Sequence, residues 1–148
     1  MDSKKRVVIG VSGASGSLLG LECLKCLREA GAESHLVMSR GAEITAKQEL
    51  GMDFDEFASY ADVVYDNRNI GASIASGTFP IDGMVVAPCS MKTLAGIACG
   101  YSDNLLLRAA SPGAYGSRDA VFSHSYRQHG KALPRVRRHD HAADAYVL

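Results

Sequence analysis

The sequence predicts one α/β domain built on a doubly wound parallel sheet. Short apolar runs rich in β-branched residues end at Gly or Pro, and a helical pattern follows most of them. This alternation implies parallel strands joined by right-handed crossovers, with helices on both faces in a three-layer αβα arrangement. A length of 148 residues suits a single core of this kind.

The first half of the chain alternates regularly between the two patterns. Residues 6–11 (RVVIGV) form a strand that is apolar on both faces, as parallel strands usually are. Residues 17–30 repeat apolar side chains at helical spacing, and Gly31 is the expected C-terminal cap. Residues 33–38 then predict a second strand, and residues 41–50 predict a second helix.

The second half is less regular. Residues 54–67 predict a short helix and then a strand at 63–65, and residues 70–76 a short helix or loop. Residues 82–87 form a buried strand that Pro88 ends. Residues 90–99 follow as a helix with Ser90 at its N-cap, and residues 103–110 predict a further helix.

Composition excludes several classes of protein. No apolar run approaches the ~20 residues of a membrane span, and the polar N-terminus lacks a secretory apolar region, so we expect a cytoplasmic protein outside the membrane. Residues 111–148 carry a basic excess and four of the five histidines. Their few aromatic residues do not form a stacking pattern, so we expect no nucleic-acid partner. We also expect no metal site there.

Three loops fall at the carboxyl ends of the predicted strands, where ligands bind in such sheets. The first is VSGASG, where Gly13 and Gly16 allow a ligand close to the backbone and Ser15 lies beside a helix start that attracts anions. It is neither the dinucleotide fingerprint nor a Walker loop. Close strand–helix packing explains these small residues equally well.

The other two loops add hydroxyl groups and charge. In residues 88–93, Ser90 and Thr93 flank a first helical turn and Lys92 adds a cation, so two hydroxyl-rich helix starts favour phosphate binding. Ser39 follows the second strand, as a ribose or phosphate contact or as a helix cap. From the residues alone, Glu49 is best interpreted as a solvated surface carboxylate.

The segments VSGASG, HLVMS and SGTFPIDGMVVAPCSMKTLAGIACGYSDNLLLRAA together resemble the UbiX-type flavin prenyltransferases, over residues 6–110. The resemblance implies a Rossmann/flavodoxin-like domain that binds FMN in a homo-oligomer, typically a dodecamer, without a metal. Family members join a dimethylallyl group from dimethylallyl phosphate to reduced FMN. The prenylated FMN serves a UbiD-type decarboxylase.

The resemblance also implies roles for single residues. Matching positions make Gly13, Ala14 and Ser15 the first FMN loop and Ser39 a second contact. The phosphate-side loop is then Ser90, Met91, Lys92 and Thr93. Ser15 and Glu49 stand at the positions of catalytic, proton-handling residues. Arg108 matches a family arginine with a structural or subunit-contact role.

The resemblance stops after Ala110. The family's next strand, its R-E-T-P loop and its P-P-M-P motif are absent from residues 111–148, but a forward-shifted reading frame permits similar residues in the same order. We hypothesise a small deletion with a change of frame, which the nucleotide sequence of the gene tests. We therefore expect a flavoprotein domain at 1–110 with an incomplete C-terminal part, and a disordered or loosely packed tail at 111–148. The sheet would lose its last strand and the helix covering it.

Three alternatives remain open. One is an FMN-binding fragment without turnover. Another is a related flavin-dependent cysteine decarboxylase, although that group has an early histidine and a P-A-S-A-N-T-like loop where this chain has PCSMKT. An NAD-dependent dehydrogenase is the most distant alternative, because the G-x-G-x-x-G fingerprint is missing.

Overall fold

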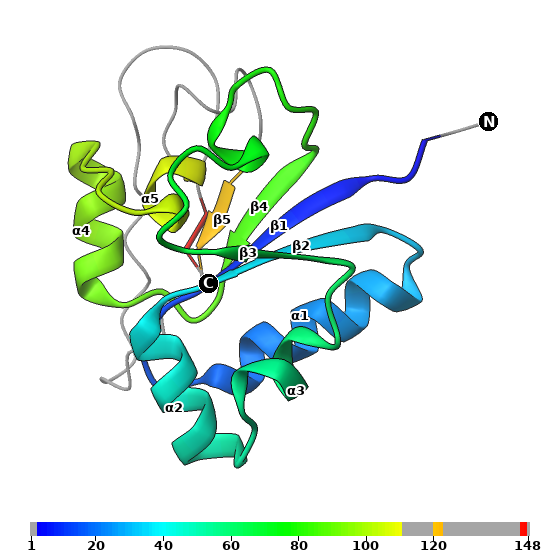
Figure 1. Ribbon diagram of the computed structural model, residues 1–148, viewed down its shortest axis with the longest axis vertical. Helices are drawn as coiled ribbons and strands as arrows, with labels where there is room; N and C mark the ends of the chain where they lie inside the picture. The colour runs from blue at the N-terminus through cyan, green and yellow to red at the C-terminus, as the bar shows by residue number, and fades with distance from the viewer. Residues whose placement is uncertain (1–2, 111–119, 123–145, 148) are drawn as a thin grey trace.

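The computed structural model describes residues 3–110, 120–122 and 146–147, and its centre is a parallel sheet (Figure 1). The strand order is β3-β2-β1-β4-β5-β6, and every neighbouring pair is parallel. The strands are β1 (Arg6–Val11), β2 (Glu33–Met38), β3 (Val63–Asp66), β4 (Gly83–Val86), β5 (Ala120–Phe122) and β6 (Tyr146–Val147). The order reverses between β1 and β4, which is where such sheets bind ligands.

Helices cover both faces of this sheet, so the predicted three-layer α/β architecture is confirmed. Figure 1 shows α1 (Ser17–Glu29), α2 (Arg40–Leu50) and α3 (Phe54–Ala58) on one side. The other side carries the 3₁₀ turn η1 (Ser73–Ala75), α4 (Met91–Cys99) and α5 (Leu105–Ala109). β1 and β2 have the predicted bounds, whereas the strand predicted at 82–87 is shorter and β3 extends one residue beyond 63–65.

Two buried clusters, one on each face, hold the layers together. Successive residues of a strand point to opposite faces. Ile9 therefore packs with Leu24 and Phe57 beneath α1 and α3, while Val8 packs with Ile74 and Leu106 beneath η1 and α5. This is why apolar residues run almost continuously through β1.

The sheet does not end at β4, so the expectation that it loses its last strand is wrong. β5 pairs with β4 from Met84↔Ala120 to Val86↔Phe122, and β6 pairs with β5. An exposed row of β4 amide and carbonyl groups favours pairing with any short β-prone segment, and AVF and YV are such segments. The covering helix and the expected disorder of the tail concern residues outside the described ranges.

A carboxylate ties β3 to β2 at the amino ends of the strands. Asp62 accepts hydrogen bonds from the backbone N–H of Ser34 (2.8 Å) and from its hydroxyl (3.1 Å). The backbone N–H is the main reason why the pKa of Asp62 lies below its ordinary value of 3.8. This bond therefore stabilises the folded state above the unfolded pKa and is lost as the pH falls through the lower, folded pKa.

We expect Asp62→Asn to weaken the dependence of stability on pH. The free energy of unfolding of the unmodified chain should fall as the pH drops from about 5 to about 2, and the fall should be smaller in the variant. Urea unfolding at several pH values measures this. Asp55→Asn, which changes an exposed carboxylate on α3, is the control. An equally large weakening of the pH dependence in that variant would contradict the role of Asp62.

Candidate functional site

The three predicted loops meet at one cavity of about 560 Å³ at the carboxyl edge of the sheet. Its size lies within the ~300–1,000 Å³ typical of small-molecule and cofactor sites. Five predicted residues line it: Gly13, Ser39, Ser90, Lys92 and Thr93. Ala14, Ser15 and Met91 adjoin these residues in the chain without being lining residues themselves. Glu49 contacts the first loop from α2.

The first loop lies tightly against the start of α2. A Cβ atom on Gly13 would lie 3.1 Å from the Cα and carbonyl carbon of Gly41, so a side chain there would push the two backbones apart by a few tenths of an ångström. Thr45 Oγ1 donates a hydrogen bond of 3.0 Å to the Gly13 carbonyl. Gly16 then caps α1 with φ +109°, a left-handed conformation that glycine adopts at little cost.

Glu49 is held at the start of α1. Its two carboxylate oxygens accept the N–H of Gly16 at 3.1 and 3.0 Å. The positive end of the helix dipole favours a carboxylate at this place. Glu49 is exposed, as the residues alone predict, but it is bound to the loop that contains Ser15 rather than free in solvent. The two predicted catalytic residues thus belong to one corner of the site.

The start of α4 is arranged differently. Ser90 Oγ accepts the N–H of Thr93 (3.2 Å), which confirms the predicted N-cap, and donates its own hydrogen to Thr93 Oγ1 (2.9 Å). The Thr93 hydroxyl must therefore direct its hydrogen elsewhere, and Thr93 lines the cavity. The N–H groups of Met91 and Lys92 belong to the first turn, which the helix itself cannot satisfy. This end of α4 offers several hydrogen-bond donors to an anion.

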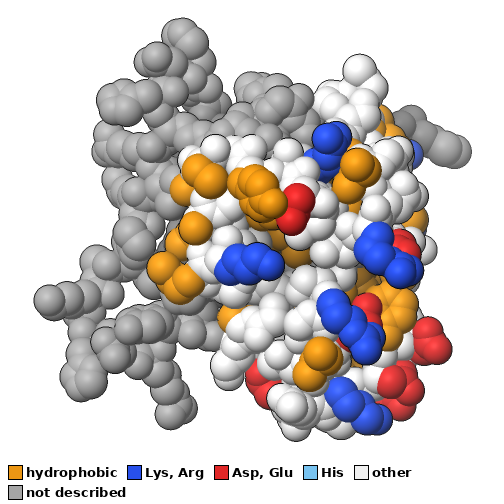
Figure 2. Space-filling view, turned by 60° about the vertical axis from the view of Figure 1, so that its left-hand side comes forward, with side chains coloured by type: hydrophobic (Ala, Val, Ile, Leu, Met, Phe, Trp, Pro, Cys, Tyr) orange, Lys and Arg blue, Asp and Glu red, His pale blue; other side chains and the backbone are white. Residues whose placement is uncertain are grey.

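Charge around the cavity is also favourable to an anion. Arg40 and Lys92 both line it, but Arg40 forms a 2.8 Å ion pair with Glu43. Among the described lining residues, Lys92 is the cation for which no ion pair is recorded. Figure 2 brings the α4 side forward and shows hydrophobic side chains gathered there around a few basic ones.

Several lining residues were not predicted. Asn67 follows β3 at the same edge of the sheet, and its backbone and side-chain oxygens accept the N–H groups of Leu105 and Leu106, both at 2.8 Å. It lines the cavity together with Tyr101 and Asn104. The rule that ligands bind at the carboxyl ends of strands would have indicated Asn67, since it directly follows a strand.

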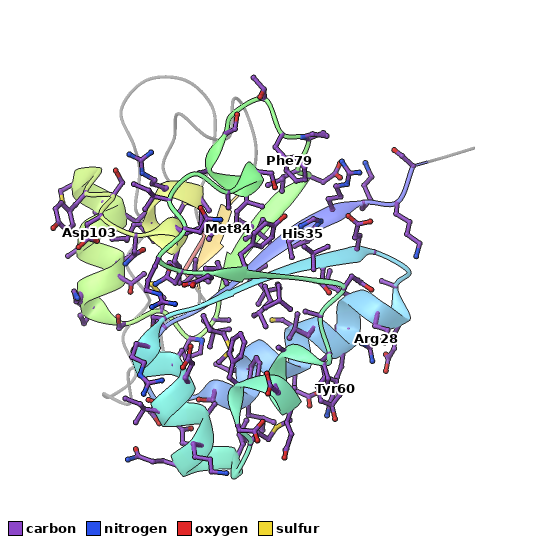
Figure 3. All side chains as sticks on the ribbon, in the orientation of Figure 1. Arg28, His35, Tyr60, Phe79, Met84 and Asp103 are labelled. Atoms are coloured by element: carbon purple, nitrogen blue, oxygen red, sulfur yellow. The ribbon has the colours of Figure 1, made fainter. Side chains whose placement is uncertain are left out.

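The early histidine, His35, is not placed to contribute to the cavity. His35 is buried within β2, where Nε2 lies 2.7 Å from Glu33 Oε1 and Nδ1 lies 2.9 Å from Tyr65 Oη. Its ring meets Phe79 edge-on, and Figure 3 shows these two side chains on the same side of the sheet. His35 does not line the 560 Å³ cavity. This geometry argues against the histidine-dependent cysteine decarboxylase alternative.

The described ranges contain no group of three or more His, Cys, Asp or Glu side chains placed to hold a metal ion. No helix there is long and apolar enough to cross a membrane. Cys89 lies in the third loop but is buried, and burial raises the pKa of its thiol to about 12, so the thiol stays protonated near neutral pH.

Known proteins resemble this chain in sequence. Residues 1–119 match the Flavoprotein family. A probable UbiX-like flavin prenyltransferase from Sedimentibacter hydroxybenzoicus is 55% identical over 106 residues, covering 71% of this chain and 56% of that protein. The flavin prenyltransferase UbiX of Neisseria meningitidis serogroup B is 54% identical over 106 residues, covering 72% and 56%. The chain therefore spans a little over half the length of these curated relatives.

Solved structures also resemble this chain in fold. AnUbiX (PadA1), crystallised with FMN and dimethylallyl pyrophosphate, has a TM-score of 0.79 at 38% identity, covering 83% of this chain and 66% of that chain. A dodecameric FMN-dependent UbiX-like decarboxylase from Escherichia coli O157:H7 has a TM-score of 0.79 at 41% identity, covering 82% and 67%. The cysteine decarboxylase TvaF, at 18% identity and a TM-score of 0.63 over 84% and 75%, shares only the fold.

Proposed function

The chain belongs to the Flavoprotein family, and from this premise we propose that its 560 Å³ cavity binds FMN. The observation that carries the proposal is the convergence of all three predicted loops on this cavity. The close approach of Gly13 and Gly41 leaves a wall without side chains, which suits a flat ring system near the backbone. Ser39 lines the cavity after β2. The residues present therefore fit the cofactor.

The phosphate of FMN is assigned to the start of α4. Two helix starts face this edge, but the carboxylate of Glu49 already occupies the start of α1. At α4 the hydroxyl of Thr93, the N–H groups of Met91 and Lys92, and the ammonium group of Lys92 remain available as donors. A phosphate at a helix N-terminus is stabilised by both the free N–H groups and the dipole.

For the reaction, we propose transfer of a dimethylallyl group from dimethylallyl phosphate to reduced FMN, in which the C–O bond of the phosphate ester breaks and inorganic phosphate leaves. Two curated relatives above 50% identity carry the name flavin prenyltransferase, and AnUbiX was crystallised with FMN and dimethylallyl pyrophosphate. Reduced FMN supplies the nucleophile when bound. Glu49 accepts and returns a proton at its carboxylate, and Ser15, next to Gly16, hydrogen-bonds the reacting groups.

We also propose a protein partner, an oligomeric state and a cellular location for the chain. The product would be passed to a UbiD-type decarboxylase, and the chain would assemble as a homo-oligomer, as the E. coli relative does. Cytoplasmic location is supported by the four cysteines, all within the described residues, which form no disulfide bond with one another.

A second candidate is an FMN-binding protein without turnover. It is favoured by the match to curated relatives over 106 of 148 residues, because the family motifs expected after Ala110 are absent from this sequence. Purified protein supplied with reduced FMN and dimethylallyl phosphate separates the candidates. Prenylated FMN detected by mass spectrometry supports the transferase, and tight FMN binding without product supports the second candidate.

FMN should protect one cysteine from alkylation and leave another unprotected. Cys99 is exposed and lines the cavity, whereas Cys26 is exposed on α1. At an FMN concentration about ten times its Kd, iodoacetamide should modify Cys99 about tenfold more slowly. Peptide mass spectrometry measures both sites in one sample, so Cys26 is the internal control. Unchanged alkylation of Cys99 at saturating FMN contradicts binding in this cavity.

A further inference from the structure

Ser12 joins the first loop to the third through its buried side chain. It directly follows β1 and is 1% exposed. Its hydroxyl donates a hydrogen bond to the carbonyl of Pro88 and accepts one from the N–H of Ser90, both at 2.7 Å. The backbone N–H of Ser12 also donates to Pro88 at 3.1 Å. Ser12 thus forms hydrogen bonds with the backbone of both Pro88 and Ser90, just before the first turn of α4.

These bonds begin where the strand pairing ends. The last paired residues of β1 and β4 are Gly10 and Val86, followed by one further bond from the N–H of Ala87 to Gly10. Beyond that point the two strands enter their loops, and Ser12 forms three hydrogen bonds between these loops. The bond from the Ser90 N–H is at the short end of the range for its type, and the bond to the Pro88 carbonyl has the usual length for a hydroxyl donor. Two of these three hydrogen bonds belong to the hydroxyl, which therefore contributes to the relative position of the two loops.

A series of hydrogen bonds leads from Ser12 to the cavity. The N–H of Ser90 is fixed by Ser12, and the Ser90 hydroxyl in turn binds both the N–H and the hydroxyl of Thr93. That arrangement directs the Thr93 hydrogen away from Ser90. Ser12 itself does not line the cavity, so it acts through Ser90 and Thr93.

We propose that Ser12 is a positioning residue for the phosphate of FMN, because its hydroxyl fixes the α4 helix start whose donors bind that phosphate. The inference rests on the proposed binding of FMN. It concerns the phosphate end of the ligand alone.

A matched control is present at the opposite edge of the sheet. Ser34 is 2% exposed, and its hydroxyl also donates one bond and accepts another, to the carboxylate (3.1 Å) and from the N–H (3.0 Å) of Asp62. Ser34→Ala therefore removes an equally buried bridge of two hydrogen bonds near the amino ends of β2 and β3. Any effect of general destabilisation should be common to Ser34→Ala and Ser12→Ala.

The experiment compares FMN with riboflavin, which lacks the phosphate. Flavin fluorescence titrations of the full chain and the two variants give both dissociation constants. Loss of one partner in a buried hydrogen bond costs about 1 kcal/mol or more, so Ser12→Ala should raise the Kd of FMN by about fivefold or more. The Kd of riboflavin should rise far less, so that the preference for FMN shrinks. Ser34→Ala should leave this preference unchanged.

Each outcome bears on the inference. An unchanged FMN preference in Ser12→Ala overturns the role of Ser12 while the binding of FMN by the unmodified chain stands. Failure of the unmodified chain to bind FMN overturns the proposed function and this inference with it. Ser12→Cys, which keeps a weak donor and fills the space, replaces the alanine variant if that variant does not fold. It should show the same selective loss for FMN.

Discussion

Replacing Gly20 with alanine is expected to lower the free energy of unfolding by about 2–3 kcal/mol. Gly20 lies near the start of α1, one turn after the N-cap Gly16, where the helix packs on the sheet. A Cβ atom there would lie 2.6 Å from the carbonyl oxygen of Ala87 and 3.0 Å from Val11 Cγ2. Because the first contact is with backbone, α1 or the segment before Pro88 must move. This cost exceeds the gain of about 1 kcal/mol from alanine's higher helix propensity.

Gly96→Ala is the matched control for this prediction. Gly96 is also buried in a helix, α4, and gains the same propensity, but its Cβ atom would meet only the end of the Leu107 side chain, at 3.0 Å or more. Leu107 can adjust its rotamer, so the loss should be much smaller. Urea unfolding of both variants measures the difference. Equal losses of stability would contradict the close backbone approach at Gly20.

Glu49→Gln is expected to lower the rate of prenylated FMN formation by about 10²–10⁴-fold, the usual contribution of a general acid or base. Glutamine keeps one side-chain oxygen that can accept the Gly16 N–H, so the first loop and FMN affinity should change little. What glutamine loses is the ability to take up and return a proton. The effect should therefore appear in kcat, with the Kd of FMN nearly constant.

Glu22→Gln provides the comparison, on α1. Glu22 forms an exposed ion pair with Lys25, and neither residue lines the 560 Å³ cavity, so its neutralisation should leave the rate nearly unchanged. Single-turnover measurements followed by mass spectrometry give the rates, and fluorescence titration gives FMN affinity. If Glu49→Gln lost FMN binding and activity together, Glu49 would be a structural support for the loop rather than a proton carrier.

The parts of the fold that follow local patterns could be predicted from the sequence. β1 and the second half of β2 are apolar on both faces because helices cover them from both sides, and this makes both strands recognisable in the sequence. The Ser90 cap could also be predicted, because its bond to Thr93 spans three residues. β5 could not, since its pairing with β4 depends on contacts across more than thirty residues of chain.

In the candidate site, too, some features could be predicted from the sequence and others could not. The three loops could be located from the ends of the strands, but the residues that hold them in position act over long sequence distances. Ser12 contacts Ser90 across 78 residues and Asn67 contacts Leu106 across 39. Glu49 illustrates the limit: its spacing in α2 indicates only an exposed carboxylate, and its contact with Gly16 exists because α2 packs beside α1.

The carboxylate of Glu49 at the start of α1 also affects ligand orientation. A sheet edge with two equivalent helix starts could accept an elongated anionic ligand in either of two opposite directions, with its charged end at one helix or the other. A fixed negative charge at α1 repels the charged end there and leaves α4 as the favourable position. One acidic side chain would thereby make the two helix starts unequal and favour one alignment of the ligand in the cavity.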